Sequence, residues 1–507
     1  RGILMALKKV KTENGFVEGL PGGNYTVSVF KGIPYAAPPV GENRWKAPQP
    51  VENWDGVYQA FKFKPMCPQA EPGTPWEKQE NPEPLWAQDE DCLYCNVWTP
   101  AVREDEKLPV LLWIHGGANV VGRGHEMSVD GEGLAQRGVI VVTFNWRVNI
   151  FGWLAHKELS EENPDHISGN YAVLDQIAVL KWVRRNIEAF GGDPENITIN
   201  GLSAGGSSTM NMCMTPLTRG LFKNAIMQSG GGFDLFTSTM IPTLKQYEDM
   251  VDLKRALGVD SIAEARKLDA QEIIRRISRP EAAGAYLPMQ VADGVIFPDT
   301  NTEICKKEMY HKINYIIGYT KDESHMYEPN FDKEAFIQDV KNEYGDYAED
   351  YLKLCDFLQD DEAFKKHMIS RSGELLRTAA ENFAELVSSH GNGPVYVYCF
   401  ARRMPDGDHT TFHGSDQWFQ FETLGRCNWR DFTGTDFDLS KTYAKFFANF
   451  CKTGNPNGTD VPKWKPFTEQ ERITMVLDEN AGERELPDNP RIQFRKDYVL
   501  KRLPEKK

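Results

Sequence analysis

The sequence predicts an α/β protein with one large, mostly parallel central sheet covered by helices, and with a small antiparallel β region near the N-terminus. Two observations carry this prediction. Several apolar runs are unbroken, which indicates strands that are buried on both faces, as in a parallel sheet under helices. Helical stretches lie between these runs, and the order strand, helix, strand implies right-handed crossovers.

The N-terminal part, residues 10–57, is rich in Gly and Pro and contains short alternating apolar runs, which predict small antiparallel strands. Fully buried strands are expected at 108–114, 138–145, 197–200 and 224–227. Apolar residues recur at helical spacing over 174–190, and the Gly-Gly-Asp-Pro string at 191–194 ends that predicted helix.

Two charged stretches, around 237–279 and 360–388, are also predicted to be helical. We interpret them as insertions or covering helices after the core strands. Because no internal repeat or linker is visible, residues 1–507 are expected to form a single domain. The basic end of the chain, 495–507, is expected to be solvated.

Charge and composition exclude several classes of function. The formal net charge is -15, which argues against binding to nucleic acid backbones. No apolar run reaches the roughly 18 residues that span a bilayer, so no transmembrane segment is expected. The N-terminus lacks the apolar segment of a secretion signal, which favours a cytoplasmic protein. The nine cysteines show no repeated metal spacing, so no metal site is expected, and the oligomeric state is not indicated.

The strongest local motif is Gly201-Leu202-Ser203-Ala204-Gly205. This G-x-S-x-G string follows a predicted strand and precedes a helix-compatible stretch, which is the context that gives the motif its meaning. A serine on such a sharp turn projects its hydroxyl from the sheet, and glycine two positions away on each side avoids a steric clash. The motif predicts that Ser203 is a nucleophile in an α/β-hydrolase fold.

Acyl transfer also requires N–H donors where the carbonyl oxygen becomes an anion. The string His115-Gly116-Gly117-Ala118-Asn119 follows a predicted buried strand, and its glycines allow close approach of the backbone. We expect oxyanion donors in this turn, with the N–H of Ala204 as a further donor.

A base and an acid must follow the serine in this fold. His413 is the best candidate base because it lies in a turn-like stretch after the apolar run 395–400, and His409 is its close competitor. The polar loop after the apolar run at 316–320 offers Asp322 or Glu323 as the acid, and the pattern alone does not choose between them.

Together these strings resemble the type B carboxylesterase and cholinesterase-like family of α/β-hydrolases, over about residues 15–467. The landmarks, in family order, are Phe30-Lys-Gly-Ile-Pro-Tyr-Ala, Glu90-Asp-Cys-Leu-Tyr, Asn145-Trp-Arg, Phe190-Gly-Gly-Asp-Pro, Gln228-Ser-Gly and Thr453-Gly-Asn-Pro-Asn. The resemblance implies that Glu323 is the acid and His413 the base.

The resemblance also implies oxyanion donors at Gly117, Ala118 and Ala204, with Ser229 supporting the acid. It further implies two structural ion pairs, Arg44 with Glu90 and Arg147 with Asp175, and a disulfide between Cys67 and Cys92. A bridged Cys67–Cys92 pair and a removed signal peptide would favour a secreted protein instead of a cytoplasmic one.

Some residues depart from the family pattern. Leu202 stands where the family usually has Glu, which weakens the case for cationic substrates such as choline esters. Asn149 replaces a common glycine, and Ser324 replaces the glycine after the acid. Leu202, Trp153, Trp418 and Phe421 flank matched motifs and are candidate pocket residues, although aromatic residues near a core more often serve packing.

The sequence therefore predicts a serine carboxylesterase that needs no cofactor, forms an acyl-enzyme and acts on small to medium aryl or alkyl esters. Two alternatives stay open at this point: a non-catalytic adhesion or binding relative, and an amidase on the same scaffold. A small-molecule ester is the expected partner.

Overall fold

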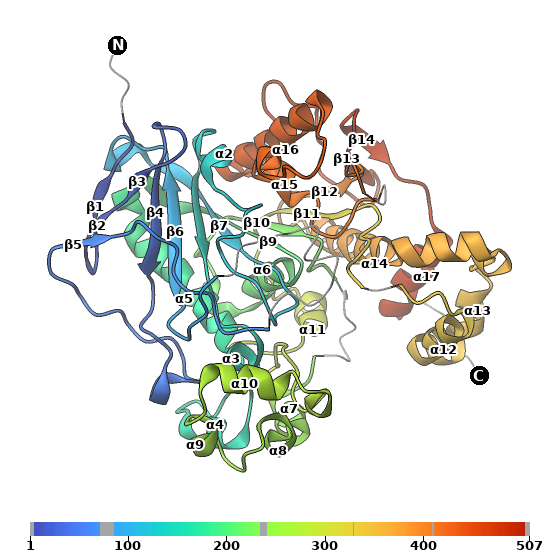
Figure 1. Cartoon of the computed structure of the whole chain (residues 1–507). Helices are drawn as coiled ribbons and strands as arrows, with labels where there is room; N and C mark the ends of the chain where they lie inside the picture. The colour runs from blue at the N-terminus through green and yellow to red at the C-terminus, as the bar shows by residue number, and fades with distance from the viewer. Residues whose placement is uncertain (1–4, 71–85, 234–240, 328, 408–409, 502–507) are drawn as a thin grey trace.

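The computed structural model of the chain describes residues 5–70, 86–233, 241–327, 329–407 and 410–501. Figure 1 shows a twisted central sheet with helices on both faces. The sheet has eleven strands in the order β14-β13-β12-β11-β10-β9-β7-β8-β6-β4-β3. Neighbouring strands from β8 to β13 are parallel, and the strands at both ends of the sheet are antiparallel.

The strands of this sheet are β3 (Leu20–Pro21), β4 (Ser28–Pro34), β6 (Tyr94–Thr99), β7 (Leu108–Ile114), β8 (Ile140–Phe144), β9 (Gly192–Leu202), β10 (Asn224–Gln228), β11 (Asn314–Thr320), β12 (Val395–Phe400), β13 (Ile473–Leu477) and β14 (Gly482–Glu485). The four predicted buried strands are confirmed as β7, β8, β9 and β10. The predicted helix is also confirmed, as α5 (Tyr171–Asn186) followed by a short 3-10 turn.

The N-terminal strands β1 (Lys9–Thr12), β2 (Gly15–Glu18) and β5 (Val57–Gln59) form a separate small sheet. β1 pairs with β2 in antiparallel fashion, whereas β5 runs parallel to β2. Strands β3 and β4 leave this region and extend the large sheet at its edge. The expected small β region is thus present, and part of it belongs to the main sheet.

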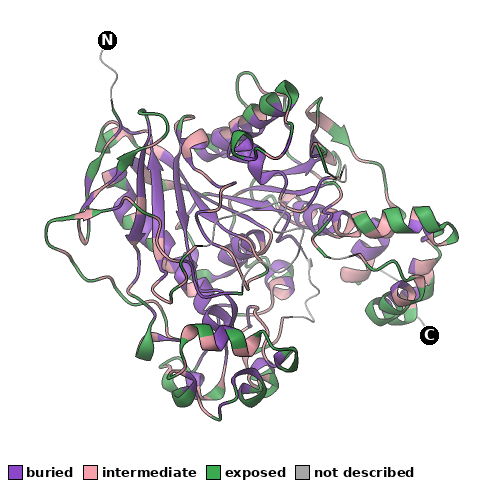
Figure 2. Cartoon of the chain, viewed as in Figure 1, coloured by how far each residue is buried: buried purple, intermediate pink, exposed green. Residues whose placement is uncertain are grey.

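Side chains that alternate along each central strand enter two different apolar cores. On β7, Val110 and Leu112 face the core beneath α5 and α6 (Ala204–Met214), whereas Leu111 and Trp113 face the core beneath α16 (Gly434–Thr453). Figure 2 shows these strands buried along their length and the covering helices exposed on their outer faces. Burial on both faces explains why the strand sequences are apolar without alternation.

The remaining α-helices are mostly short. They are α2 (Glu132–Ala135), α3 (Asn149–Trp153), α4 (Lys157–Glu162), α7 (Leu244–Met250), α8 (Leu253–Leu257), α9 (Ile262–Ala265), α10 (Ala270–Ile277), α11 (Asn301–Lys306), α12 (Lys333–Tyr344), α13 (Ala348–Leu352), α14 (Asp361–Ser389), α15 (Gln417–Gln420) and α17 (Pro490–Val499). Both charged stretches are helical as predicted, the first as α7 to α10 and the second as α14, although residues 237–240 lie outside the described residues. Within the described ranges, no helix is long and apolar enough to cross a membrane.

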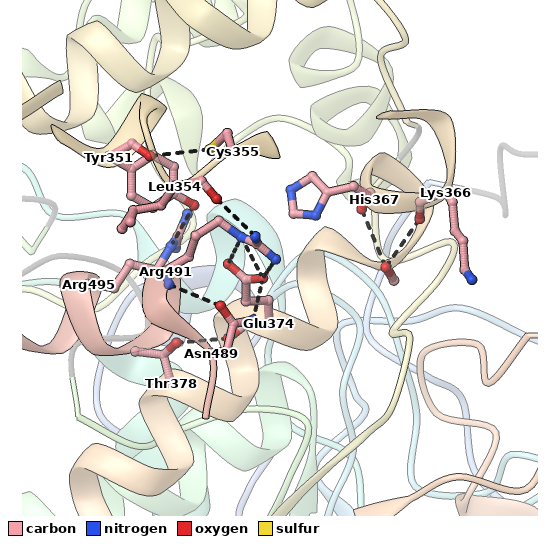
Figure 3. A network of polar contacts seen from close by, with 11 residues as sticks. Tyr351, Leu354, Cys355, Lys366, His367, Glu374, Thr378, Asn489, Arg491 and Arg495 are labelled. Carbon is pink, nitrogen blue, oxygen red and sulfur yellow. Dashed lines mark hydrogen bonds and ion pairs between the residues drawn. The ribbon is translucent and has the colours of Figure 1, made fainter. Parts of the chain in front are cut away.

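A polar network joins the C-terminal helix α17 to α14 (Figure 3). Glu374 of α14 accepts hydrogen bonds from Arg491 at 2.9 Å and from the Nδ2 atom of Asn489 at 3.0 Å. The expectation of a solvated basic end is wrong for its first residues, because Arg495 and Lys496 are buried on α17. Packing of α17 against α12 to α14 overrides the tendency of a charged run to remain in water.

Candidate active site

Ser203 occupies a strained turn between β9 and α6. Its φ and ψ angles are 59° and -125°, and its N–H donates to the carbonyl of Gln228 at 2.8 Å. A Cβ atom at Gly201 would lie 2.2 Å from the Gly205 carbonyl oxygen, and one at Gly205 would lie 2.0 Å from the Ile114 carbonyl oxygen. Both glycines of the motif are therefore required by close contacts of the backbone. Ser203 itself stays partly exposed.

The loop after β7 packs directly on this turn. A Cβ atom at Gly116 would lie 3.0 Å from the Cβ atom of Ser203. Gly117 and Ala118 have φ angles of 107° and 52°, and Ala118 is exposed. Among the described residues, none accepts a hydrogen bond from the N–H of Gly117 or Ala118. Two unused N–H groups therefore lie in a loop that contacts the Ser203 turn and the start of α6.

The loops after β11 and β12 pair with each other and bring an acid and a base together. The N–H of His413 donates to the carbonyl of Ser324 at 2.9 Å. The Nδ1 atom of His413 lies 2.5 Å from Oε2 of Glu323. An ionised carboxylate only accepts hydrogen bonds, so this contact favours the tautomer with the proton on Nδ1 and the lone pair on Nε2. This is the tautomer that a general base requires.

The carboxylate of Glu323 is enclosed by donors. Its side chain is fully buried, and Oε1 accepts hydrogen bonds from the Ser229 hydroxyl and from the Thr320 N–H, both at 2.6 Å. With His413, three donors satisfy this buried charge. The position of Ser229 is therefore consistent with support of the acid.

The structure separates the two acids that the sequence left open. The Oδ2 atom of Asp322 accepts hydrogen bonds from the N–H of Thr411 at 3.0 Å and from its hydroxyl at 3.1 Å. Asp322 thus fastens the two loops to each other, and its neighbour Glu323 faces the imidazole. The alternative base, His409, lies outside the described residues.

The Nε2 atom of His413 is buried and has no hydrogen-bond partner in the part of the chain that is described. The hydrogen bond to Ser203 is therefore not formed in this structure. The two loops do touch, because a Cβ atom at Gly414 would lie 3.0 Å from a terminal carbon of Leu202. Catalytic hydrogen bonds are often long in a substrate-free site and tighten when substrate binds.

A buried carboxyl group that the sequence analysis missed lies three residues after His413. The Oδ2 atom of Asp416 accepts hydrogen bonds from the hydroxyls of Tyr398 (2.9 Å) and Tyr443 (3.0 Å) and from Nε2 of Gln228 (3.3 Å). Burial, and then the charge of Glu323, raise the pKa of Asp416, while these three hydrogen bonds oppose the shift. Nothing local in the sequence indicates this burial, because its partners come from β10, β12 and α16.

The candidate pocket residues are buried among other side chains. Trp153 packs edge-on against Trp146 with ring centroids 6.2 Å apart, and Phe421 packs edge-on against Trp113 at 5.0 Å. Trp418 packs in the same manner against Trp429, at 5.8 Å. These three aromatic side chains pack in the core, and Leu202, also buried, lies next to the His413 loop; a role of the four residues in lining a pocket stays a prediction.

The two expected ion pairs are confirmed. Arg44 contacts Glu90 through two hydrogen bonds of 2.7 and 2.5 Å, and Arg147 contacts Asp175 through two of 2.8 and 2.7 Å. Cys67 and Cys92 are both buried and carry free thiols in this structure. A hydrogen bond with Cys67, together with burial, raises the pKa of Cys92.

Comparison with known proteins gives this geometry a context. The model of the carboxylesterase family matches residues 6–495. Para-nitrobenzyl esterase of Bacillus subtilis (strain 168) is 32% identical, over 96% of this chain and 97% of that protein. Fumonisin B1 esterase of Sphingopyxis macrogoltabida is 30% identical, over 94% and 87%, and human cocaine esterase is 30% identical, over 97% and 90%.

Solved structures agree with these relatives. A PNB esterase structure superposes with a TM-score of 0.78 at 30% identity, covering 97% of this chain and 99% of that one. The strand order, the serine turn and the relatives lead to one conclusion: the chain belongs to the carboxylesterase family and is a serine carboxylic-ester hydrolase with the α/β-hydrolase fold.

Proposed function

We propose that Ser203, His413 and Glu323 carry out this hydrolysis through an acyl-enzyme on Ser203. The observation that supports the proposal best is the 2.5 Å contact between His413 and Glu323, since it leaves the Nε2 lone pair on the far side of the imidazole. The loop that carries this imidazole contacts Leu202, the residue before Ser203.

In the first half of the reaction the Ser203 hydroxyl oxygen attacks the ester carbonyl carbon, and His413 Nε2 takes the hydroxyl proton. The tetrahedral intermediate then breaks its bond to the alcohol oxygen, which leaves with the proton from His413. In the second half a water molecule attacks the acyl group, His413 takes the water proton, and the acid is released as Ser203 regains its proton. Glu323 orients the imidazole and stabilises its charged form throughout.

We further propose that the N–H groups of Gly117, Ala118 and Ala204 bind the oxyanion. The first two are unused in loop hydrogen bonds among the described residues, and the third opens helix α6, where backbone N–H groups lack partners within the helix. The helix N-terminus adds a favourable partial charge for the anion. Loss of one such donor typically slows a reaction by about 100- to 1,000-fold.

The substrates that we propose are small to medium aryl or alkyl esters. Leu202 next to the nucleophile is uncharged and buried, which favours a neutral ester over a cationic one. The relatives include a protein named para-nitrobenzyl esterase, and this name suggests 4-nitrobenzyl esters, which are aryl-methyl esters, as probe substrates.

The direct test uses a panel of 4-nitrophenyl and 4-nitrobenzyl esters of increasing acyl length, with Ser203→Ala as the control. From the 4-nitrophenyl esters the enzyme is expected to release 4-nitrophenol in a burst equal to the enzyme concentration, and mass spectrometry is expected to find the acyl group on Ser203. A burst that persists in Ser203→Ala would exclude Ser203 as nucleophile. Anilides of the same acids, tested in parallel, separate an esterase from an amidase.

A further inference from the structure

The loop that carries the proposed oxyanion donors has an unfavourable backbone conformation. Ala118 and Asn119 are consecutive residues other than glycine with positive φ, at 52° and 64°, and Gly117 and Gly122 have φ angles of 107° and 117°. Residues in this region cost free energy, so the surrounding structure must hold them there.

Asn149 holds the middle of this loop. Its N–H donates to the carbonyl of Asn119 at 2.6 Å, and its Nδ2 atom donates to the carbonyl of Pro68 at 2.8 Å. Asn149 is 3% exposed, and its own φ angle is 47°, a conformation that glycine and asparagine tolerate best. Glycine could adopt this backbone conformation equally well. The asparagine side chain adds a hydrogen bond to the segment 67–69.

Gln69 holds the end of the same loop. Its Oε1 atom accepts from the N–H of Gly122 at 2.8 Å, and its Nε2 atom donates to the carbonyl of Gly122 at 3.0 Å. The same Nε2 atom donates to the carbonyl of Cys67 at 2.9 Å, and the side chain is 5% exposed. Segment 67–69 is thus bonded to the loop at two places, through two buried amides.

The loop has little room to move against these amides. A Cβ atom at Gly117 would lie 2.2 Å from the Val121 carbonyl oxygen, and one at Gly122 would lie 2.3 Å from His115 Nδ1. His115 in turn bonds the Gly116 carbonyl through the same nitrogen at 2.8 Å. A small shift of residues 119–122 would therefore either displace Gly117 and Ala118 or be blocked by these close contacts.

We propose that Asn149 and Gln69 are positioning residues that aim the N–H groups of Gly117 and Ala118 at the oxyanion. This inference rests on the proposed function, because it assumes that these two N–H groups bind the oxyanion. Donors that are aimed at developing charge stabilise the transition state more than the bound ester. Loosening them should lower kcat and leave KM nearly unchanged.

Three substitutions test the proposal. Asn149→Gly keeps a residue that tolerates positive φ and removes the side-chain bonds of Asn149, which are the 2.8 Å bond to the Pro68 carbonyl and two of 3.4 Å, to the Val120 carbonyl and from the Phe151 N–H. Asn149→Asp keeps the shape but turns an acceptor oxygen toward the Pro68 carbonyl, and Gln69→Glu does the same toward the carbonyls of Cys67 and Gly122. Asn342→Asp, an exposed position on α12, is the control for a new negative charge.

We expect Asn149→Asp and Gln69→Glu to lower kcat by about 10- to 100-fold, less than full loss of a donor, with KM within about twofold. Affinity for an alkyl trifluoromethyl ketone, which forms a tetrahedral adduct with the serine, should fall by the same factor as kcat. Asn149→Gly should show a smaller loss of the same kind, and Asn342→Asp should match the wild type.

Unchanged kcat and ketone affinity in folded variants would overturn the proposal, as would a change confined to KM. Thermal unfolding of each variant identifies those that are folded, and Asn149→Gly keeps the test decisive if both acidic variants unfold. The proposed function has its own readout: if the wild type forms no acyl-enzyme on Ser203, that proposal fails. If the wild type forms the acyl-enzyme and the variants keep the kcat and ketone affinity of the wild type, the positioning role is rejected and the proposed function stands.

Discussion

The Nδ1 atom of His413 lies 2.5 Å from Oε2 of Glu323, although the two residues are 90 positions apart in the sequence. Each follows a strand of the parallel sheet, β12 for His413 and β11 for Glu323, and these strands are neighbours. The bond of the His413 N–H to the Ser324 carbonyl sets the spacing of the two loops. The arrangement favours the tautomer of the imidazole with the proton on Nδ1.

Replacing this acid by its amide should nearly abolish turnover. In Glu323→Gln the amide can present its NH2 group to Nδ1, which favours the tautomer with the proton on Nε2 and removes the base. We expect kcat to fall by about 1,000- to 10,000-fold, as is typical of such a change in a serine triad. The measurement is steady-state hydrolysis of a 4-nitrophenyl ester.

The adjacent carboxylate supplies the matched control. Asp322→Asn disturbs the bonds to Thr411 but leaves the contact between Glu323 and His413 in place, so the loss of kcat should be no more than about tenfold. Equal losses in the two variants would argue that the acid is not Glu323.

Asp416 should make stability depend on pH. Its pKa in the folded chain is raised above its ordinary value of 3.8, by burial and by the charge of Glu323. Between the two values the folded chain binds more protons than the unfolded chain, so the free energy of unfolding falls as pH rises through this interval. Asp416→Asn removes this titration and can still accept hydrogen bonds from the two tyrosine hydroxyls.

The stability of Asp416→Asn relative to the wild type should therefore be higher at about pH 7.5 than at about pH 4. Urea unfolding followed by tryptophan fluorescence at both pH values measures this difference. A difference that is the same at both pH values would contradict the assignment.

His367 should make the chain sensitive to acid in the opposite direction. Its ring stacks on Phe357 with centroids 3.8 Å apart (Figure 3 shows the imidazole beside the Glu374 network). Burial is the main cause that lowers the pKa of His367 from 6.5 to about 4, with a further contribution from Arg491, while Glu374 opposes it. Between these values the unfolded chain binds more protons, so the free energy of unfolding falls as pH drops from 6.5 toward 4.

We expect His367→Phe to lose this part of the acid sensitivity, which amounts to about 2 kcal/mol for a partly exposed ring. Thermal unfolding at about pH 7 and about pH 4.5 compares the variant with the wild type. Parallel loss of stability in both proteins on acidification would show that other groups carry the effect.

Leu202 should set the preference for uncharged esters. A carboxylate at this buried position would lie next to the nucleophile, where it attracts a cationic alcohol group. Leu202→Glu is expected to raise the ratio of kcat/KM for a choline ester to that for its neutral 3,3-dimethylbutyl isostere by roughly three- to tenfold. Leu202→Gln is the control for size and polarity, and an equal ratio in the two variants would exclude an electrostatic cause.

Local features of the sequence were enough to predict the central strands, the turn at Ser203 and the glycine-rich loop at Gly117. Unbroken apolar runs arise wherever a strand is covered on both faces, and the two glycines around Ser203 are required by contacts within the turn and with the adjoining strand. These constraints act over a few residues, so they leave a pattern that can be read from one sequence.

Local features of the sequence left two adjacent acids open, and the tertiary structure decided that Glu323 faces His413 and Asp322 faces Thr411, in agreement with the family resemblance. It also decided the burial of Asp416, whose partners come from three separate elements, and the contacts of Asn149 and Gln69 behind the oxyanion loop. Hydrogen bonds between residues far apart in the chain depend on how the sheet and its loops assemble. For that reason no spacing in the sequence encodes them.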